Sequence, residues 1–134
     1  MRRFLPCAVL ALALALPAAA DTKDEVTSVI QSQIEAFLAD DFATAFTFAS
    51  PGIKGMFGSS DRFGQMVREG YPMVWRPAEV QYLDLRTEGG YPAQRVLITD
   101  ENGASHLLEY RMLPSGDGWQ IGGVRILEAA GVGA

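Results

Sequence analysis

Apolar residues recur at every third or fourth position near the start of this sequence, a spacing that puts them on one face of a helix. The segment opens with Thr22-Lys-Asp-Glu25, in which the Thr22 hydroxyl and the Glu25 carboxylate can each accept a hydrogen bond from the backbone of the first turn. We therefore expect an amphipathic helix over about residues 22–38 that turns its apolar face toward a core. That face comprises Val26, Val29, Ile30, Ile34, Phe37 and Leu38.

The helical pattern then stops and restarts twice, which predicts two shorter helices. The pair Asp40-Asp41 supplies a cap for the first of them, and Ser59 or Ser60 caps the second, which ends at Gly70. Between the two, Ser50-Pro51 is a helix start signal, but three closely spaced glycines follow it. We expect only one turn of helix or a loop there.

From residue 79 onward, apolar residues alternate with polar ones, which is typical of strands. We expect strands over about residues 79–86, 93–99 and 119–127, and a further strand that begins directly after Asn102-Gly103. Asparagine followed by glycine tolerates the positive φ angles of a two-residue hairpin turn, so this pair is the strongest local signal in the chain.

A two-residue turn at Asn102-Gly103 would set the register of the hairpin, because residues whose numbers add to 205 would stand opposite each other. The predicted pairs are His106 with Thr99, Leu108 with Leu97, and Tyr110 with Arg95. The opposite face then mixes Val96, Ile98 and Leu107 with charged residues. Since neither face is plainly a solvent face, we expect the second side to be covered as well, for example by another copy of the protein.

Helices followed by a meander of strands predict an α+β fold, in which three N-terminal helices pack on one face of a four-stranded antiparallel sheet. Such a sheet, when twisted, encloses a cone-like cavity beneath the helices. The chain has 134 residues, and we expect one domain over residues 21–128 with a flexible tail over residues 129–134.

The first twenty residues have the three zones of a secretory signal peptide. Two early arginines are followed by an apolar run from Phe4 to Leu16 and by a small-residue exit that fits cleavage between Ala20 and Asp21. The apolar run is shorter than the ~20 residues that span a bilayer. We therefore expect a periplasmic or secreted protein that keeps no membrane attachment after cleavage.

Removal of this leader makes the protein more acidic. The whole chain carries 11 basic and 16 acidic residues, and the loss of the two leader arginines changes the net charge from −5 to −7. An acidic surface repels nucleic acid and anionic lipid, so we expect neither as a partner. The one cysteine, Cys7, lies in the leader, so we expect no disulfide and no thiolate chemistry in the mature chain.

We expect neither a metal nor a cofactor. A zinc site needs three or four closely placed ligands, whereas the mature chain has a single histidine, His106, and no cysteine. The carboxylates lack the spacing of a calcium loop. The glycines fit neither a dinucleotide fingerprint nor a phosphate-binding loop.

Short runs of residues between positions 24 and 127 form a recognisable combination. They are Ile34-Glu-Ala-Phe37, Asp40-Asp41-Phe42, Ala45-Phe46, Ala49-Ser50-Pro51, Ile53-Lys54, Phe63, Met66-Val67, Tyr71-Pro72, Asp117-Gly118-Trp119 and Ile121. In this combination the chain resembles the domain-of-unknown-function family numbered 4864, found in exported alphaproteobacterial proteins. The resemblance implies a cystatin-like cone, related to the nuclear-transport-factor-two and ketosteroid-isomerase superfamily. That superfamily includes isomerases, dehydratases, transport adaptors and ligand-binding modules, so the resemblance implies a fold more than a function.

Aromatic, aliphatic and sulfur-containing side chains supply the candidate site for a small apolar ligand. Small-molecule pockets are lined mostly by such groups, with a few polar ones, although core packing explains the same residues. The candidates are Met66, Tyr71, Trp75, Leu97, His106, Leu108, Tyr110 and Met112. Arg76, Arg95 and Arg125 are candidates to pair with an acidic ligand, but internal salt bridges explain them more simply.

Acid–base catalysis has three weaker candidates. A free imidazole titrates near neutrality, which suits His106 to proton transfer, whereas Asp41 is a candidate base and Tyr110 a candidate donor to an oxyanion. A structural role is the simpler account of two of them, since His106 can bond at a strand end and Asp41 can cap a helix.

The leading interpretation is a non-catalytic exported module that holds a small apolar or amphipathic ligand, or a partner chain. One alternative is a small cofactor-free isomerase or lyase, which would place His106, a tyrosine and a carboxylate around one solvent-reachable cavity. The other alternative is a homodimeric structural domain that associates through the sheet.

Overall fold

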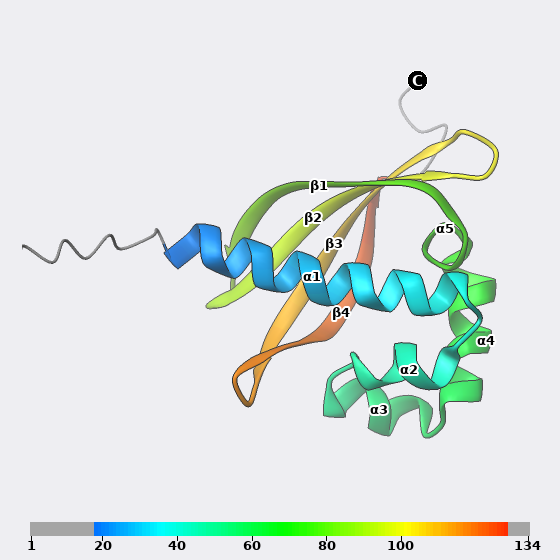
Figure 1. Cartoon of the computed structure of the whole chain (residues 1–134), viewed down its shortest axis with the longest axis horizontal. Helices are drawn as coiled ribbons and strands as arrows, with labels where there is room; N and C mark the ends of the chain where they lie inside the picture. Colours follow the sequence, from blue (N-terminus) through cyan, green and yellow to red (C-terminus); the bar gives the residue numbers. More distant parts are fainter. Residues whose placement is uncertain (1–17, 129–134) are drawn as a thin grey trace, which may run out of the picture.

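The computed structural model describes residues 18–128, in which the helices precede the strands (Figure 1). The helices are α1 (Ala18–Leu38), α2 (Phe42–Thr47), α3 (Pro51–Phe57), α4 (Ser60–Gly70) and α5 (Pro72–Trp75). The strands are β1 (Pro77–Glu88), β2 (Tyr91–Asp100), β3 (Ser105–Ser115) and β4 (Gly118–Glu128). Most of the predicted leader and the whole predicted tail lie outside the described residues.

The strands form one antiparallel sheet in the order β1-β2-β3-β4. Helix α1 crosses one face of this sheet, and the shorter helices gather near the C-terminal end of α1 (Figure 1). The core between α1 and the sheet includes Ile30, Ile34, Phe37, Ile98, Leu108 and Tyr110. These features confirm the predicted α+β class and its four-stranded antiparallel sheet.

The prediction of three helices is wrong, because α3 and α5 bring the number in the described residues to five. Ser50 caps α3 by accepting a hydrogen bond from the Ile53 backbone at 3.4 Å. Gly58 ends the helix in the left-handed region, at φ 79°, which glycine adopts without steric cost. The start signal at Ser50 therefore outweighs the two glycines inside α3.

The other helix starts match the sequence in part. Asp41 caps α2 by accepting a hydrogen bond from the Thr44 backbone, and Ser59 caps α4, as predicted. Helix α1, however, begins at Ala18, so Thr22 lies within the helix and not at its cap.

The predicted register of the β2–β3 hairpin is wrong by one residue. Ile98 stands opposite His106, and the backbone N–H of Asp100 donates to the Ala104 carbonyl at 2.8 Å. The turn between them has three residues and includes Gly103 at φ 84°. The Asp100 carboxylate stabilises this longer turn by accepting hydrogen bonds from the backbone N–H groups of Asn102 and Ala104, at 2.9 and 3.0 Å.

The shifted register changes which residues face the helices. The face that α1 covers carries the buried residues Val96, Ile98, Leu108 and Tyr110. Leu97 pairs with Leu107 on the opposite face, which we call the outer face. A slip of one residue has this effect because side chains alternate between the two sides of a strand.

Strand β4 is an edge of the sheet, and residues 48–50 cover part of that edge. Ala49 forms a parallel bridge with Ile121, whose N–H donates to the Phe48 carbonyl at 2.8 Å and whose carbonyl accepts from the Ser50 N–H at 2.9 Å. The next residue, Gly122, is the extra residue of a bulge against β3. These contacts place the start of α3 directly beside β4.

Candidate functional site

A pocket of about 260 Å³ lies between α3, α4 and β4. None of the described residues that line it is charged, and most of them are apolar. We call it the apolar pocket. Its lining includes Phe37, Ile53, Phe57, Phe63, Met66 and Ile121.

Helix α3 closes one side of the apolar pocket and is lightly packed. None of its residues is buried, and Met56, which lines the pocket, is 74% exposed. The helix has seven residues, among them Gly52 and Gly55, and glycine lowers helix stability by about 1 kcal/mol relative to alanine. Of the helices and strands that line the pocket, α3 is the one without a buried residue.

Two polar side chains, Gln33 and Tyr71, also line the apolar pocket. The Gln33 amide donates to the Ala45 carbonyl at 3.1 Å, and the Tyr71 hydroxyl donates to the Val124 carbonyl at 3.2 Å. These hydrogen bonds fix both side chains in place, while the Tyr71 oxygen keeps acceptor capacity. A molecule in this pocket would be held mainly by apolar contact.

A smaller pocket of about 140 Å³ lies at the β2–β3 turn, and its lining includes Arg76, Asp100 and His106. Nε2 of His106 lies 2.8 Å from Oδ2 of Asp100. This hydrogen bond, together with those from the turn backbone, holds the pKa of Asp100 below its usual range. The other ring nitrogen, Nδ1, is buried and has no hydrogen-bond partner among the described residues. A general base must reach its substrate, so Nδ1 is poorly placed for that role.

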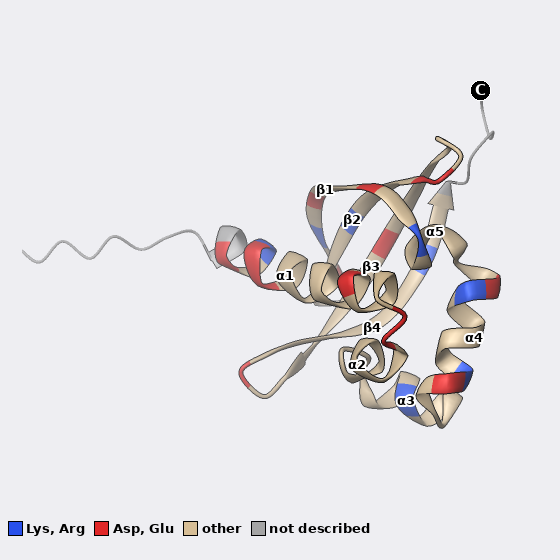
Figure 2. Ribbon diagram, turned by 45° about the vertical axis from the view of Figure 1, so that its right-hand side comes forward, with Lys and Arg blue, Asp and Glu red and all other residues tan. Residues whose placement is uncertain are grey.

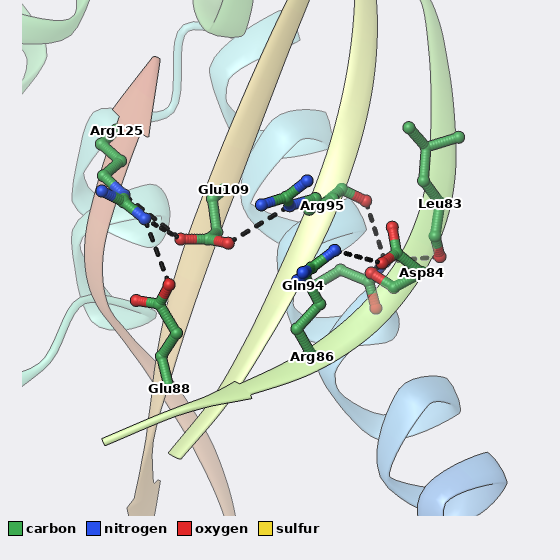
Figure 3. Close-up of polar contacts among 8 residues, drawn as sticks. All are labelled: Leu83, Asp84, Arg86, Glu88, Gln94, Arg95, Glu109 and Arg125. Carbon is green, nitrogen blue, oxygen red and sulfur yellow. Dashed lines mark hydrogen bonds and ion pairs between the residues drawn. The ribbon is translucent and has the colours of Figure 1, made fainter. Parts of the chain in front are cut away.

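The outer face of the sheet carries a buried carboxylate, Glu109, between two arginines (Figure 3). Arg125 donates to Glu109 Oε1 from Nη2 at 2.7 Å and from Nε at 3.2 Å, and Arg95 Nε lies 3.4 Å from Oε2. Glu88, at the end of β1, accepts from the same Nη2 of Arg125 at 3.3 Å. Burial alone would raise the pKa of Glu109, but the hydrogen bonds from Arg125 and Arg95 outweigh burial, and the pKa lies below its usual range.

A third hollow, of about 300 Å³, lies over this network, and we call it the outer hollow. Its lining consists of Glu88, Glu109, Arg111, Gly123, Val124 and Arg125. Charges of both signs occur on the strands and on α4 (Figure 2). Within the described residues, however, no three histidine, cysteine or acidic side chains gather in a group that could hold a metal ion.

A family model described as "Domain of unknown function (DUF4864)" matches residues 19–134. The chain belongs to this family. The match to DUF4864 includes every described residue except Ala18. It confirms the family resemblance that the short runs of residues indicated. No curated protein and no solved structure matches the chain. Within residues 18–128, no helix of the DUF4864 domain is long and apolar enough to cross a membrane.

Two of the predicted ligand-binding residues, Met66 and Tyr71, line the apolar pocket. The other six lie elsewhere: Leu108, Tyr110 and Met112 are in the core, His106 is in the smaller pocket, Leu97 is on the outer face, and Trp75 donates to Asp40 at 2.9 Å. The predicted salt-bridge role of the three arginines is confirmed, since each of them pairs with a carboxylate.

Sequence reasoning missed the side of the apolar pocket that α3 provides. Ile53 and Phe57 line the pocket from this helix, and they follow the start signal Ser50-Pro51 at helical spacing. The helix would have been predicted if the start signal had been ranked above the glycines that follow it. Its position against β4 depends on the bridge between Ala49 and Ile121, which no local pattern reveals.

Of the three catalytic candidates, only His106 lines one of the three pockets described above. Asp41 accepts a hydrogen bond from the Thr44 backbone at 3.1 Å, which lowers its pKa and caps α2. The Tyr110 hydroxyl is buried without a partner among the described residues, and burial raises its pKa. His106 lines the smaller pocket, whose lining includes neither Asp41 nor Tyr110.

Proposed function

We propose that this DUF4864 domain is a non-catalytic module that binds one small apolar or amphipathic molecule in the apolar pocket. The pocket itself carries the proposal, because its volume of about 260 Å³ is larger than a cavity of about 150 Å³ that holds benzene. It lies just below the range of drug-sized sites, which begins at about 300 Å³. Its apolar lining with two fixed polar side chains is the usual chemistry of such sites.

The proposal includes export of the protein to the periplasm or the exterior. Its support is the order of zones in residues 1–20, with cleavage between Ala20 and Asp21. Such cleavage would remove only the first residues of α1 and leave its buried residues, which begin at Val26. We further infer a single domain over residues 21–128 with a cystatin-like cone, supported by the packing of α1 across the curved sheet.

The His106–Asp100 pair favours a second candidate function, a small cofactor-free isomerase or lyase. Nε2 of His106 lies 2.8 Å from the Asp100 carboxylate, which would orient the ring and leave the buried Nδ1 as the base. The binding module is the better-supported proposal, because the catalytic candidates lie apart. A His106→Gln variant separates the two, since it leaves ligand affinity unchanged if the apolar pocket is the working site.

Association of two copies through the outer face stays a prediction. Leu97 and Leu107 are half-buried there, beside the charged network around Glu109. Sedimentation of the protein at several concentrations measures its mass in solution, and a strictly monomeric protein would exclude this arrangement.

Binding of 1-octanol, measured by isothermal titration calorimetry, tests the main proposal. In the variant Met66→Trp a large ring fills the apolar pocket from α4, and Gln65→Trp places the same ring on the exposed side of that helix. We expect wild type and Gln65→Trp to bind octanol equally, and Met66→Trp to bind it at least about tenfold more weakly, because overpacking excludes the ligand.

A further variant, Ile53→Trp, fills the same pocket from α3, which has no buried residue. If Met66→Trp fails to fold, Ile53→Trp still tests whether a filled pocket loses octanol. Thermal melts of all variants show which of them are folded. Equal affinities in all four proteins, or the absence of octanol binding to wild type, would overturn the proposed function.

A further inference from the structure

Each of the four strands carries an arginine on the outer face, but only three of these arginines have partners among the described residues. Arg86 pairs with Asp84, while Arg95 and Arg125 share Glu109. Arg111 of β3 is exposed, and its side chain makes neither a hydrogen bond nor an ion pair within residues 18–128. Arg111 lines the outer hollow, and the donors of its guanidinium group have no partner among the described residues.

The outer hollow has room for a ligand group beside Arg111. The residue opposite Arg111 on β4 is Gly123, and a Cβ atom added at Gly123 would meet nothing within 4 Å. The buried Glu109 is already neutralised by Arg95 and Arg125, and Glu88 is bound to Arg125 through a single contact of 3.3 Å. The guanidinium groups of Arg95, Arg111 and Arg125 thus outnumber the carboxylates of Glu88 and Glu109 by one. One positive charge is therefore uncompensated.

The outer hollow adjoins the apolar pocket. Gly123 and Val124 line both of them, and these residues belong to β4, an edge strand. Two contacts cover this edge: residues 48–50 pair with Ile121, and the Tyr71 hydroxyl donates to the Val124 carbonyl. Gly122 and Gly123 lie between these two contacts. The Leu113 side chain packs against Gly122, whereas a Cβ atom at Gly123 would meet nothing within 4 Å, so Gly123 is the point at which the two spaces adjoin.

We propose that the natural ligand is an amphipathic carboxylate that occupies both spaces. Its apolar chain lies in the apolar pocket, and its carboxylate passes the edge of β4 at Gly123 to bind Arg111, with Arg125 as a second donor. This inference rests on the proposed function and adds the chemical class of the ligand. Arginine suits this role because its planar fork matches the two oxygens of a carboxylate.

Two probes of equal chain length, octanoate and 1-octanol, test the headgroup separately from the chain. Calorimetric affinities for both are measured with wild type, with Arg111→Gln, and with Arg62→Gln as a matched control. Arg62 is exposed on α4 and lines none of the three hollows. Both variants remove one positive charge, so they change the net charge of the protein equally.

We expect wild type and Arg62→Gln to bind octanoate about tenfold more tightly than octanol, because a charge-assisted hydrogen bond adds to the apolar contact. In Arg111→Gln, the two affinities should become equal, with octanol binding unchanged. Octanol binding without a preference for octanoate, or a preference that survives in Arg111→Gln, would overturn the carboxylate assignment and leave the proposed function standing. Failure of both probes to bind wild type would instead remove the proposed function, and this inference with it.

Discussion

The two faces of the sheet are stabilised by different forces. On the face that α1 covers, apolar side chains such as Ile98 and Leu108 are fully buried. On the outer face, a carboxylate is buried, because Glu109 is 3% exposed and lies between Arg95 and Arg125. Apolar burial involves no titrating group, whereas an ion pair is lost when its carboxylate is protonated. The comparison predicts that the two faces respond differently to mutation and to pH.

The end of β1 approaches β4 on the outer face, beside this buried charge. Strands β1 and β4 are the two edges, about 14 Å apart in a flat sheet, yet Glu88 of β1 contacts Arg125 of β4 at 3.3 Å. Figure 3 shows the end of β1 bending toward β4. A bulge in β1 precedes the bend, and the Gln94 side chain bonds the carbonyls of Leu83 and Asp84 there, at 2.9 and 3.3 Å.

The largest expected effect is on the face that α1 covers. Leu108→Ala should lower the free energy of unfolding by about 3 kcal/mol, because it leaves a cavity in the core. Leu107→Ala, one residue away on the outer face, should lower it by less than about 1.5 kcal/mol, since Leu107 is only half-buried. Urea unfolding measures both, and equal losses would contradict the assignment of the two faces.

A smaller loss is expected from the ion network of the outer face. Glu109→Ala should lower the free energy of unfolding by about 2 kcal/mol, because it leaves Arg95 and Arg125 side by side without their shared carboxylate. The control Glu88→Ala removes a half-exposed partner of Arg125 and should change stability by less than about 0.5 kcal/mol. A Glu109→Ala variant as stable as wild type would show that the network is not stabilising.

The contribution of Glu109 should also depend on pH. The pKa of Glu109 is lowered in the folded protein from an ordinary value of 4.5, so the folded state binds this proton less readily than the unfolded state. Its stabilising contribution is therefore complete above about pH 4.5 and is lost as the pH falls through the lower, folded-state pKa. Urea unfolding at pH 7 and at pH 3 should show a smaller difference between wild type and Glu109→Gln at the lower pH.

Asp41 and Asp100 also have lowered pKa values, but both are present in wild type and in Glu109→Gln. Their effects cancel in the comparison of the two proteins. A difference in stability that does not change with pH would show that Glu109 acts through packing instead of charge.

The smallest expected effect is at two tyrosines on the covered side of the sheet. The Tyr110 hydroxyl is buried without a partner in the described domain, so Tyr110→Phe should leave stability unchanged or raise it by up to about 1 kcal/mol. The Tyr82 hydroxyl donates to Gln31 Oε1 at 2.8 Å, and Tyr82→Phe should lower stability by about 1 kcal/mol. Thermal melts of the two variants should shift in different directions or by different amounts, and equal destabilisation would contradict the placement of Tyr110.

Elements specified by neighbouring residues could be predicted from the sequence. The cap at Asp41 and the cap at Ser59 each depend on a backbone group three residues away, and the alternation of apolar residues located all four strands. The candidate site was predictable only in part. Met66 and Tyr71 were identified because pockets for small molecules are lined mostly by aromatic and aliphatic side chains. Ile53 and Phe57 belong to a helix that lines the pocket only because it packs against β4.

The sequence by itself determined the family, the order of helices and strands, and the position of the β2–β3 turn, because these depend on short-range patterns. Tertiary structure alone decided the register of that hairpin, in which Asp100 stabilises a three-residue turn and exchanges the faces of Leu97 and Ile98. It also decided which charges meet, since Glu88 and Arg125 are 37 positions apart and come together only when the sheet curls. Local patterns act over a few residues, whereas pockets and ion networks form where distant segments pack.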